Sequence, residues 1–121
     1  MRVFKTKWFS KWAIKEGLTD VLLKAAVEEI KSGLVEADLG GNVFKKRVPL
    51  KQRGKSSSAR TILAFKQNED VFFIYGFSKN VRTNISHKEL KALKLLAKEL
   101  LNYNNEQLDK AKNTGVIEEA K

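Results

Sequence analysis

The sequence predicts an α+β fold in which a helical hairpin is followed by a small antiparallel twisted sheet and a C-terminal helix. Apolar residues recur at helical spacing up to about residue 32, which indicates the hairpin. They alternate in the strand-like middle of the chain, and helical spacing returns after residue 86. A length of 121 residues suits one compact domain.

The first helix is predicted at residues 8–14, where Trp8 and Trp12 belong to an apolar stripe. Gly17 ends it. The second helix is predicted at residues 21–32, with an N-cap supplied by Thr19 and Asp20. A glycine at position 33 fits the residue after its end.

The middle of the chain predicts three antiparallel strands joined by turns and one basic loop. The strands are residues 43–48, 59–66 and 71–77, the turns are 39–42 and 67–70, and the loop is 51–58. The third strand reads VFFIYGF and is apolar on both faces, which is typical of a central strand. Residues 3–4 are a candidate for an additional short strand.

The C-terminal helix has the clearest local signal. Ser86 and Glu89 form the pattern of a capping box, and Ile85 and Leu90 have the spacing of a hydrophobic staple. The apolar stripe that follows ends near Leu101. We therefore predict a folded domain over residues 1–101 and a frayed extension or tail over residues 102–121.

Composition excludes several classes of site. The chain has no cysteine, so disulfides, thiolate metal sites and cysteine nucleophiles are excluded. Its single histidine, His87, excludes histidine-rich metal clusters and a two-histidine acid–base pair. No apolar run approaches the about 18 residues of a membrane span, and the N-terminus lacks a signal-peptide apolar region. We expect a cytoplasmic protein that uses no metal or organic cofactor.

Positive charge is concentrated in one stretch. The chain carries 24 Lys and Arg against 14 Asp and Glu, a net charge of +10. Residues 39–68 contain no acidic residue. The basic residues of this stretch are Lys45, Lys46, Arg47, Lys51, Arg53, Lys55, Arg60 and Lys66. Such a concentration indicates a surface that faces a polyanion.

Strand alternation groups some of these cations. On the first predicted strand, one face carries Lys45 and Arg47, and the core face carries Phe44, Lys46 and Val48. Arg60 on the next strand joins Lys45 and Arg47 on a surface that we expect to lie opposite the helices.

Aromatic and basic residues near this surface suggest a cradle for single-stranded RNA. Tyr75 and Phe77 share a face of the third strand and are candidates for base stacking, while Lys79 and Arg82 follow in the next loop. The alternative reading is that the basic loops are ordinary solvated surface and the two aromatic residues belong to the core.

RNA cleavage would require deprotonation of a 2′-hydroxyl, stabilisation of the phosphorane and protonation of the 5′-oxygen. Crowded cations lower a lysine pKa, so a lysine is a candidate base. Arginine offers a planar fork to the phosphorane. His87 is a candidate acid or RNA contact, or else an ordinary surface residue.

Together these features resemble the RelE superfamily of bacterial toxins, in its HigB-like branch, over about residues 3–101. The resemblance is carried by GGNVFKKRVPLKQRGKSSSARTILAF, by VFFIYGFSKNVRTNIS and by the Lys- and Leu-rich helix that follows. It implies a RelE-like microbial RNase fold and a toxin of a type II toxin–antitoxin system. Such toxins enter the ribosomal A site and cut mRNA, and a cognate antitoxin neutralises them.

The resemblance also implies roles for particular residues. Lys45 and Arg47 match the family's basic pair, Arg60 matches its transition-state arginine, and Lys79 or Arg82 matches the basic residue after the last core strand. Lys46, Lys51, Arg53 and Lys55 are further candidate RNA contacts, and the last three match no catalytic motif. Where some members have a tyrosine near the last helix, the nearest candidates here are Ser86 and His87.

Other functions remain open at this stage. The ParE type of the superfamily inhibits DNA gyrase and cuts nothing, and a basic RNA- or DNA-binding module would share the same charge pattern. A degenerate toxin kept only as a complex-forming partner is a third possibility. The density of cations on the strands favours the RNase branch. We expect the antitoxin's contacts to be acidic or amphipathic, because the exposed face is cationic.

Overall fold

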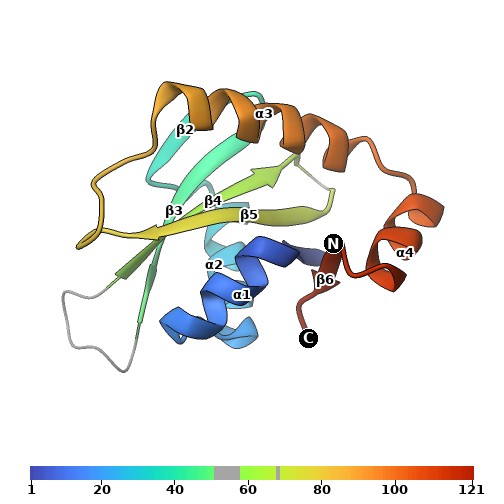
Figure 1. Ribbon diagram of the computed structural model, residues 1–121, viewed down its shortest axis with the longest axis horizontal. Helices are drawn as coiled ribbons and strands as arrows, with labels where there is room; N and C mark the ends of the chain where they lie inside the picture. The colour runs from blue at the N-terminus through green and yellow to red at the C-terminus, as the bar shows by residue number, and fades with distance from the viewer. Residues whose placement is uncertain (51–57, 68) are drawn as a thin grey trace.

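The computed structural model describes residues 1–50, 58–67 and 69–121, and in these residues helices cover both faces of a single sheet (Figure 1). In chain order the elements are β1 (Val3–Thr6), α1 (Lys7–Glu16), α2 (Asp20–Lys31), β2 (Ala37–Gly40), β3 (Val43–Pro49), β4 (Ser58–Phe65), β5 (Val71–Ser78), α3 (His87–Leu101), α4 (Asn105–Asn113) and β6 (Ile117–Glu119). The α+β class predicted from the sequence is confirmed.

The sheet has six strands in the order β2-β3-β4-β5-β1-β6. The antiparallel run from β3 to β5 is the one that the sequence predicts. The candidate strand at residues 3–4 is also confirmed, and it lies parallel to β5. β2 and β6 then extend the two ends of the sheet, each paired antiparallel to its neighbour.

Two apolar clusters form the core, one on each face of the sheet. The first packs α1 and α2 against residues such as Leu63 and Phe73. The second packs α3 and α4 against the other face, including Ile62 and Ala64. Figure 1 shows α3 crossing the sheet on the side away from α1 and α2. Because β4 and β5 are covered on both faces, they read as nearly continuous apolar runs.

Local signals in the sequence place the helix ends correctly. The Thr19 side chain accepts a hydrogen bond from Leu22 N at the start of α2, and Gly17 ends α1 in the left-handed conformation at φ 76°. Ser86 and Glu89 make the capping box of α3. The end of α1 and the starts of α2 and α3 are therefore fixed by short local motifs.

Close packing between α1 and the sheet explains one glycine of the VFFIYGF segment. A Cβ atom added at Gly76 would lie 2.2 Å from the ring of Trp12, so no larger residue fits there without movement. The absent side chain lets α1 lie flush against β5.

Two sequence predictions are wrong. Residues 39–42 were expected to be a turn, but Leu39 and Gly40 belong to β2 and the turn is shorter. Residues 102–121 were expected to fray, but they form α4 and β6, and β6 pairs with β1. β6 is stabilised by pairing with the distant β1, which a local apolar pattern does not record, and β2 is a short edge strand of a tight hairpin with β3 that carries little apolar pattern of its own.

Among the described residues, no helix is both long enough and apolar enough to cross a membrane.

Candidate functional site

Strand register brings three of the predicted cations onto one face of the sheet. Arg47 on β3 lies directly opposite Arg60 on β4, and Lys45 lies opposite Ile62 two residues away. Directly opposite residues in an antiparallel pair have Cβ atoms about 5 Å apart. Ile62 belongs to the core cluster beneath α3, so the three cations lie on the side of the sheet that α3 covers, away from α1 and α2. The expectation that it lies away from all helices is therefore wrong.

A carboxylate lies between the two arginines. Glu36 Oε1 is 3.3 Å from Arg47 Nη2 and 3.3 Å from Arg60 Nε. The Glu36 backbone N–H donates to Lys45 O at 2.8 Å, which fixes this residue beside β3 just before β2 begins. Arg60 also donates to Ser58 Oγ at 2.8 Å. Two guanidinium groups from adjacent strands thus converge on one anionic oxygen.

The two arginines differ in their access to solvent. The Arg47 side chain is 57% exposed, and the Arg60 side chain is only 8% exposed. An exposed ion pair contributes little free energy, so Arg47 is easily released from Glu36. Arg60 is held more firmly, because a nearly buried guanidinium needs its partners. We name Glu36, Arg47 and Arg60 the arginine–glutamate cluster.

Lys46 does not join this cluster. Its side chain points to the opposite face, where Nζ donates to Leu34 O at 2.8 Å and lies 2.8 Å from Glu29 Oε1 on α2. Lys46 is 8% exposed. The prediction that it contacts RNA conflicts with this burial. Its neighbour Lys45 is only half-buried and lies on the same face as the cluster.

The two aromatic candidates lie in different environments. Phe77 is opposite Arg60 in the register but is buried, with the Arg82 guanidinium 5.9 Å above its ring. Tyr75 is half-buried, and its ring stacks on Trp8 at 4.5 Å. Trp8, which belongs to the apolar stripe predicted for the first helix, is 47% exposed. An accessible aromatic stack therefore involves Tyr75 and Trp8, while Phe77 belongs to the core.

Arg82 is engaged in an ion pair within the protein. It donates through both terminal nitrogens to Glu89, at 2.9 Å for Nη1, and it lies 3.5 Å from the Tyr75 hydroxyl. The hydrogen bonds from Arg82 and from the Ser86 backbone lower the pKa of Glu89 from 4.5 to about 2. Arg82 thus orders the end of β5 and the start of α3.

The remaining predicted residues are more dispersed. Lys79 and His87 are exposed, in the loop before α3 and at its first residue. Lys51, Arg53 and Lys55 lie outside the described residues. Among the described residues, no group of three metal-binding side chains converges.

Sequence reasoning missed Glu36 because β2 was not predicted. Glu36 lies between the helix predicted at residues 21–32 and the turn predicted at residues 39–42, in a segment for which no element was predicted. A signal for it exists, since Val35 to Leu39 alternate with charged residues, a pattern typical of an edge strand.

The cluster combines two chemical capacities. Paired guanidinium groups hold a phosphate or another small oxyanion through charged hydrogen bonds. A carboxylate beside them takes up a proton when it is released from the arginines. The exposed Trp8 ring on α1, stacked on the half-buried Tyr75 of β5, adds a surface for a flat base.

Comparison with known proteins identifies the family. A search of curated proteins returns no match. The family model described as the RelE toxin of the RelE / RelB toxin-antitoxin system matches residues 1–120, which is almost the entire chain. The matched region includes the sheet, the arginine–glutamate cluster and the C-terminal α4 and β6. The chain therefore belongs to the RelE toxin family, the toxin partners of toxin–antitoxin pairs.

Proposed function

We propose that this toxin is a ribosome-dependent mRNA endoribonuclease of the HigB-like branch, acting in the cytoplasm. The observation that carries the proposal is the convergence of Arg47 and Arg60 on one carboxylate oxygen of Glu36. A non-bridging phosphate oxygen has the same charge and the same hydrogen-bond geometry as that oxygen. The scissile phosphate would displace Glu36 and take its place between the arginines.

The displaced carboxylate is then beside the substrate as a general base. Glu36 would accept the 2′-hydroxyl proton as the 2′-oxygen bonds to phosphorus. The bond from phosphorus to the 5′-oxygen breaks, and the leaving oxygen takes up a proton from water. The products are a 2′,3′-cyclic phosphate and a 5′-hydroxyl. Lys45, on the same face, is the alternative base and a further stabiliser of phosphorane charge.

The wider surface fits a nucleic acid. The net charge of +10 favours association with polyanions. The exposed stack of Trp8 on Tyr75 offers a platform for an unpaired base. Because few groups for proton transfer are gathered among the described residues of the site, the ribosome would position the message for attack.

One experiment separates this function from its alternatives. Purified toxin is added to a message alone, to the same message on translating ribosomes, and to a DNA gyrase supercoiling reaction. We expect cuts with 5′-hydroxyl ends only on translating ribosomes. Intact message together with inhibited supercoiling would instead identify a gyrase inhibitor. Intact message with unaffected gyrase would indicate a binding module or an inactive toxin.

A further inference from the structure

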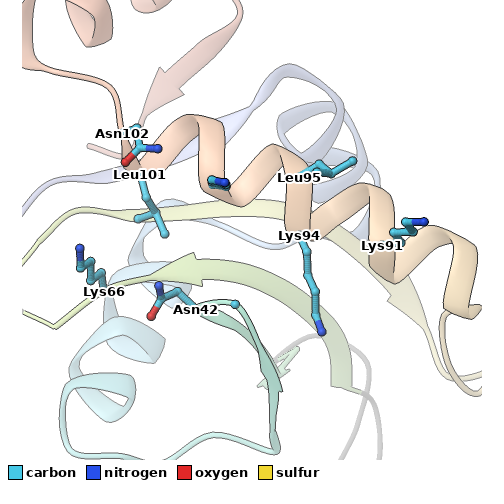
Figure 2. Close-up of a pocket in the computed structure, with 9 residues that line it drawn as sticks. Asn42, Lys66, Lys91, Lys94, Leu95, Leu101 and Asn102 are labelled. Carbon is cyan, nitrogen blue, oxygen red and sulfur yellow. The ribbon is translucent and has the colours of Figure 1, made fainter.

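A second cationic feature lies away from the arginine–glutamate cluster. A groove of about 430 Å³ runs between α3, the turn after β2 and the end of β4 (Figure 2). Its basic lining residues are Lys66, Lys91, Lys94 and Lys98. We name it the α3 groove. Asn42, which lines the groove, immediately precedes β3, and the first residue of β3, Val43, is four residues from Arg47, about 13 Å along an extended strand.

The lysines of the α3 groove are largely unneutralised. Lys91, Lys94 and Lys98 form no ion pair with any described residue, and Lys66 Nζ lies 3.9 Å from Glu69. No described residue that lines the groove is acidic. From Lys91 to Lys98 the helix rises about 10 Å, so the charges extend along two turns.

The groove also offers apolar surface. Leu95 is 66% exposed, and Leu101, the last residue of α3, is half-buried. The Lys94 side chain reaches from α3 toward the turn, as Figure 2 shows, and its methylene groups lie 3.6 Å from the position of a Cβ on Gly41. This stem adds to the apolar lining, and the ammonium nitrogen lies over Gly40, 3.2 Å from the position of a Cβ there.

The residue composition of the α3 groove favours a peptide over an RNA as its ligand. Among the described residues of the groove there is no arginine and no aromatic ring, so neither bidentate phosphate contacts nor base stacking is available. An apolar strip bordered by four ammonium groups instead complements a helix with leucine-like residues on one side and carboxylates beside them.

We propose that the α3 groove binds an acidic amphipathic segment of the cognate antitoxin. Apolar side chains of that segment would lie against Leu95 and Leu101, and its carboxylates would pair with Lys91, Lys94 and Lys98. The proposal depends on membership of a toxin–antitoxin family and not on the cleavage chemistry, because the groove and the arginine–glutamate cluster share no residue.

The test measures, by calorimetry, the binding of the toxin to its cognate antitoxin after each protein has been purified on its own. One variant combines Lys91→Glu, Lys94→Glu and Lys98→Glu. The matched control combines Lys7→Glu, Lys11→Glu and Lys15→Glu on exposed positions of α1, with the same change in charge. We expect the α3 variant to weaken binding by about 100-fold and the control by less than about 5-fold.

Leu95→Asp gives an independent readout, since this exposed side chain contributes little to folding. We expect it to weaken antitoxin binding by about 10-fold or more, with an unchanged melting temperature. Wild-type affinity in both α3 variants would overturn the proposal, as would equal losses in the α1 control. Retained antitoxin affinity with lost ribosome binding would overturn it in favour of an RNA surface. Loss of message cleavage in these variants is not a criterion, so failure of the proposed activity is detected separately.

Discussion

Lys45 and Lys46 are neighbours in the chain, yet the pleat of β3 sends them to opposite faces of the sheet. Lys45 lies on the face of the arginine–glutamate cluster, and Lys46 is buried against α2 with Glu29 and the Leu34 carbonyl as partners. Alternation in the sequence predicts this separation. It follows that two adjacent lysines have different roles, one at the surface and one in the fold.

This separation predicts contrasting effects of two alanine substitutions. Lys46→Ala removes two buried contacts and should lower the free energy of unfolding by about 1–3 kcal/mol. Lys45→Ala should leave stability unchanged within about 0.5 kcal/mol and lower message cleavage on ribosomes by about 10-fold or more. Urea unfolding and primer extension measure the two effects. A stable Lys46→Ala variant or a fully active Lys45→Ala variant would contradict the assignment.

Glu89 links stability to pH. Its pKa is lowered from the ordinary value of 4.5 to about 2 in the folded protein, because the hydrogen bonds from Arg82 and the Ser86 amide favour the ionised form. A lowered pKa means that the stabilisation is complete above pH 4.5 and is lost as the pH falls toward 2.

Glu89→Gln isolates this effect, since the amide oxygen still caps α3 but carries no charge. We expect the variant to be less stable than the wild type at about pH 6, with the difference vanishing at about pH 2. Urea unfolding at both values measures it. Glu106→Gln is the control, because this exposed carboxylate has no ion pair with a described residue. The same stability difference for Glu89→Gln at both pH values would refute the linkage.

At the scale of elements, the parts of the fold that depend on neighbouring residues were predictable. The Ser86 capping box, the alternation of β3 and the apolar β5 each follow from a few adjacent positions. β2 and β6 were missed, because an edge strand of three or four residues depends on its partner strand and carries little apolar pattern of its own. The same omission concealed Glu36, which is positioned by pairing with β3.

A local signal for α4 was nevertheless present. Asn104 and Gln107 form a second capping box, with each side chain accepting from the other's backbone N–H. The apolar residues that follow are sparse, and those that reach the core are Leu108, Ala111, Ile117 and Ala120. A capping box therefore predicts the start of a helix even where the apolar stripe that follows is weak.

The C-terminal elements should contribute to global stability. Ile117 on β6 is 1% exposed, and its neighbour Val116 is 53% exposed. Ile117→Ala should lower the free energy of unfolding by about 2–5 kcal/mol, because it leaves a cavity in the cluster beneath α3. Val116→Ala is the matched control and should change it by less than about 0.5 kcal/mol. Equal, small effects in urea unfolding would mean that β6 is dispensable.

At the scale of the whole molecule, two cationic surfaces lie near opposite ends of β3. The arginine–glutamate cluster lies at one end of β3, and the α3 groove lies at the other. On the two proposals above, one end of β3 binds the antitoxin and the other end binds the message. The positive charge of the whole chain supports both interactions, and salt should weaken each of them.

The most direct test of the proposed activity is the rate of message cleavage on translating ribosomes by Arg47→Ala and Glu36→Gln toxins, followed by primer extension. Lys11→Ala, on the exposed face of α1, is the control. Both cluster variants should cut about 100-fold more slowly than the wild type, and the control should cut at the wild-type rate. Wild-type cleavage by Arg47→Ala and Glu36→Gln would contradict the proposal that these residues hold and activate the RNA.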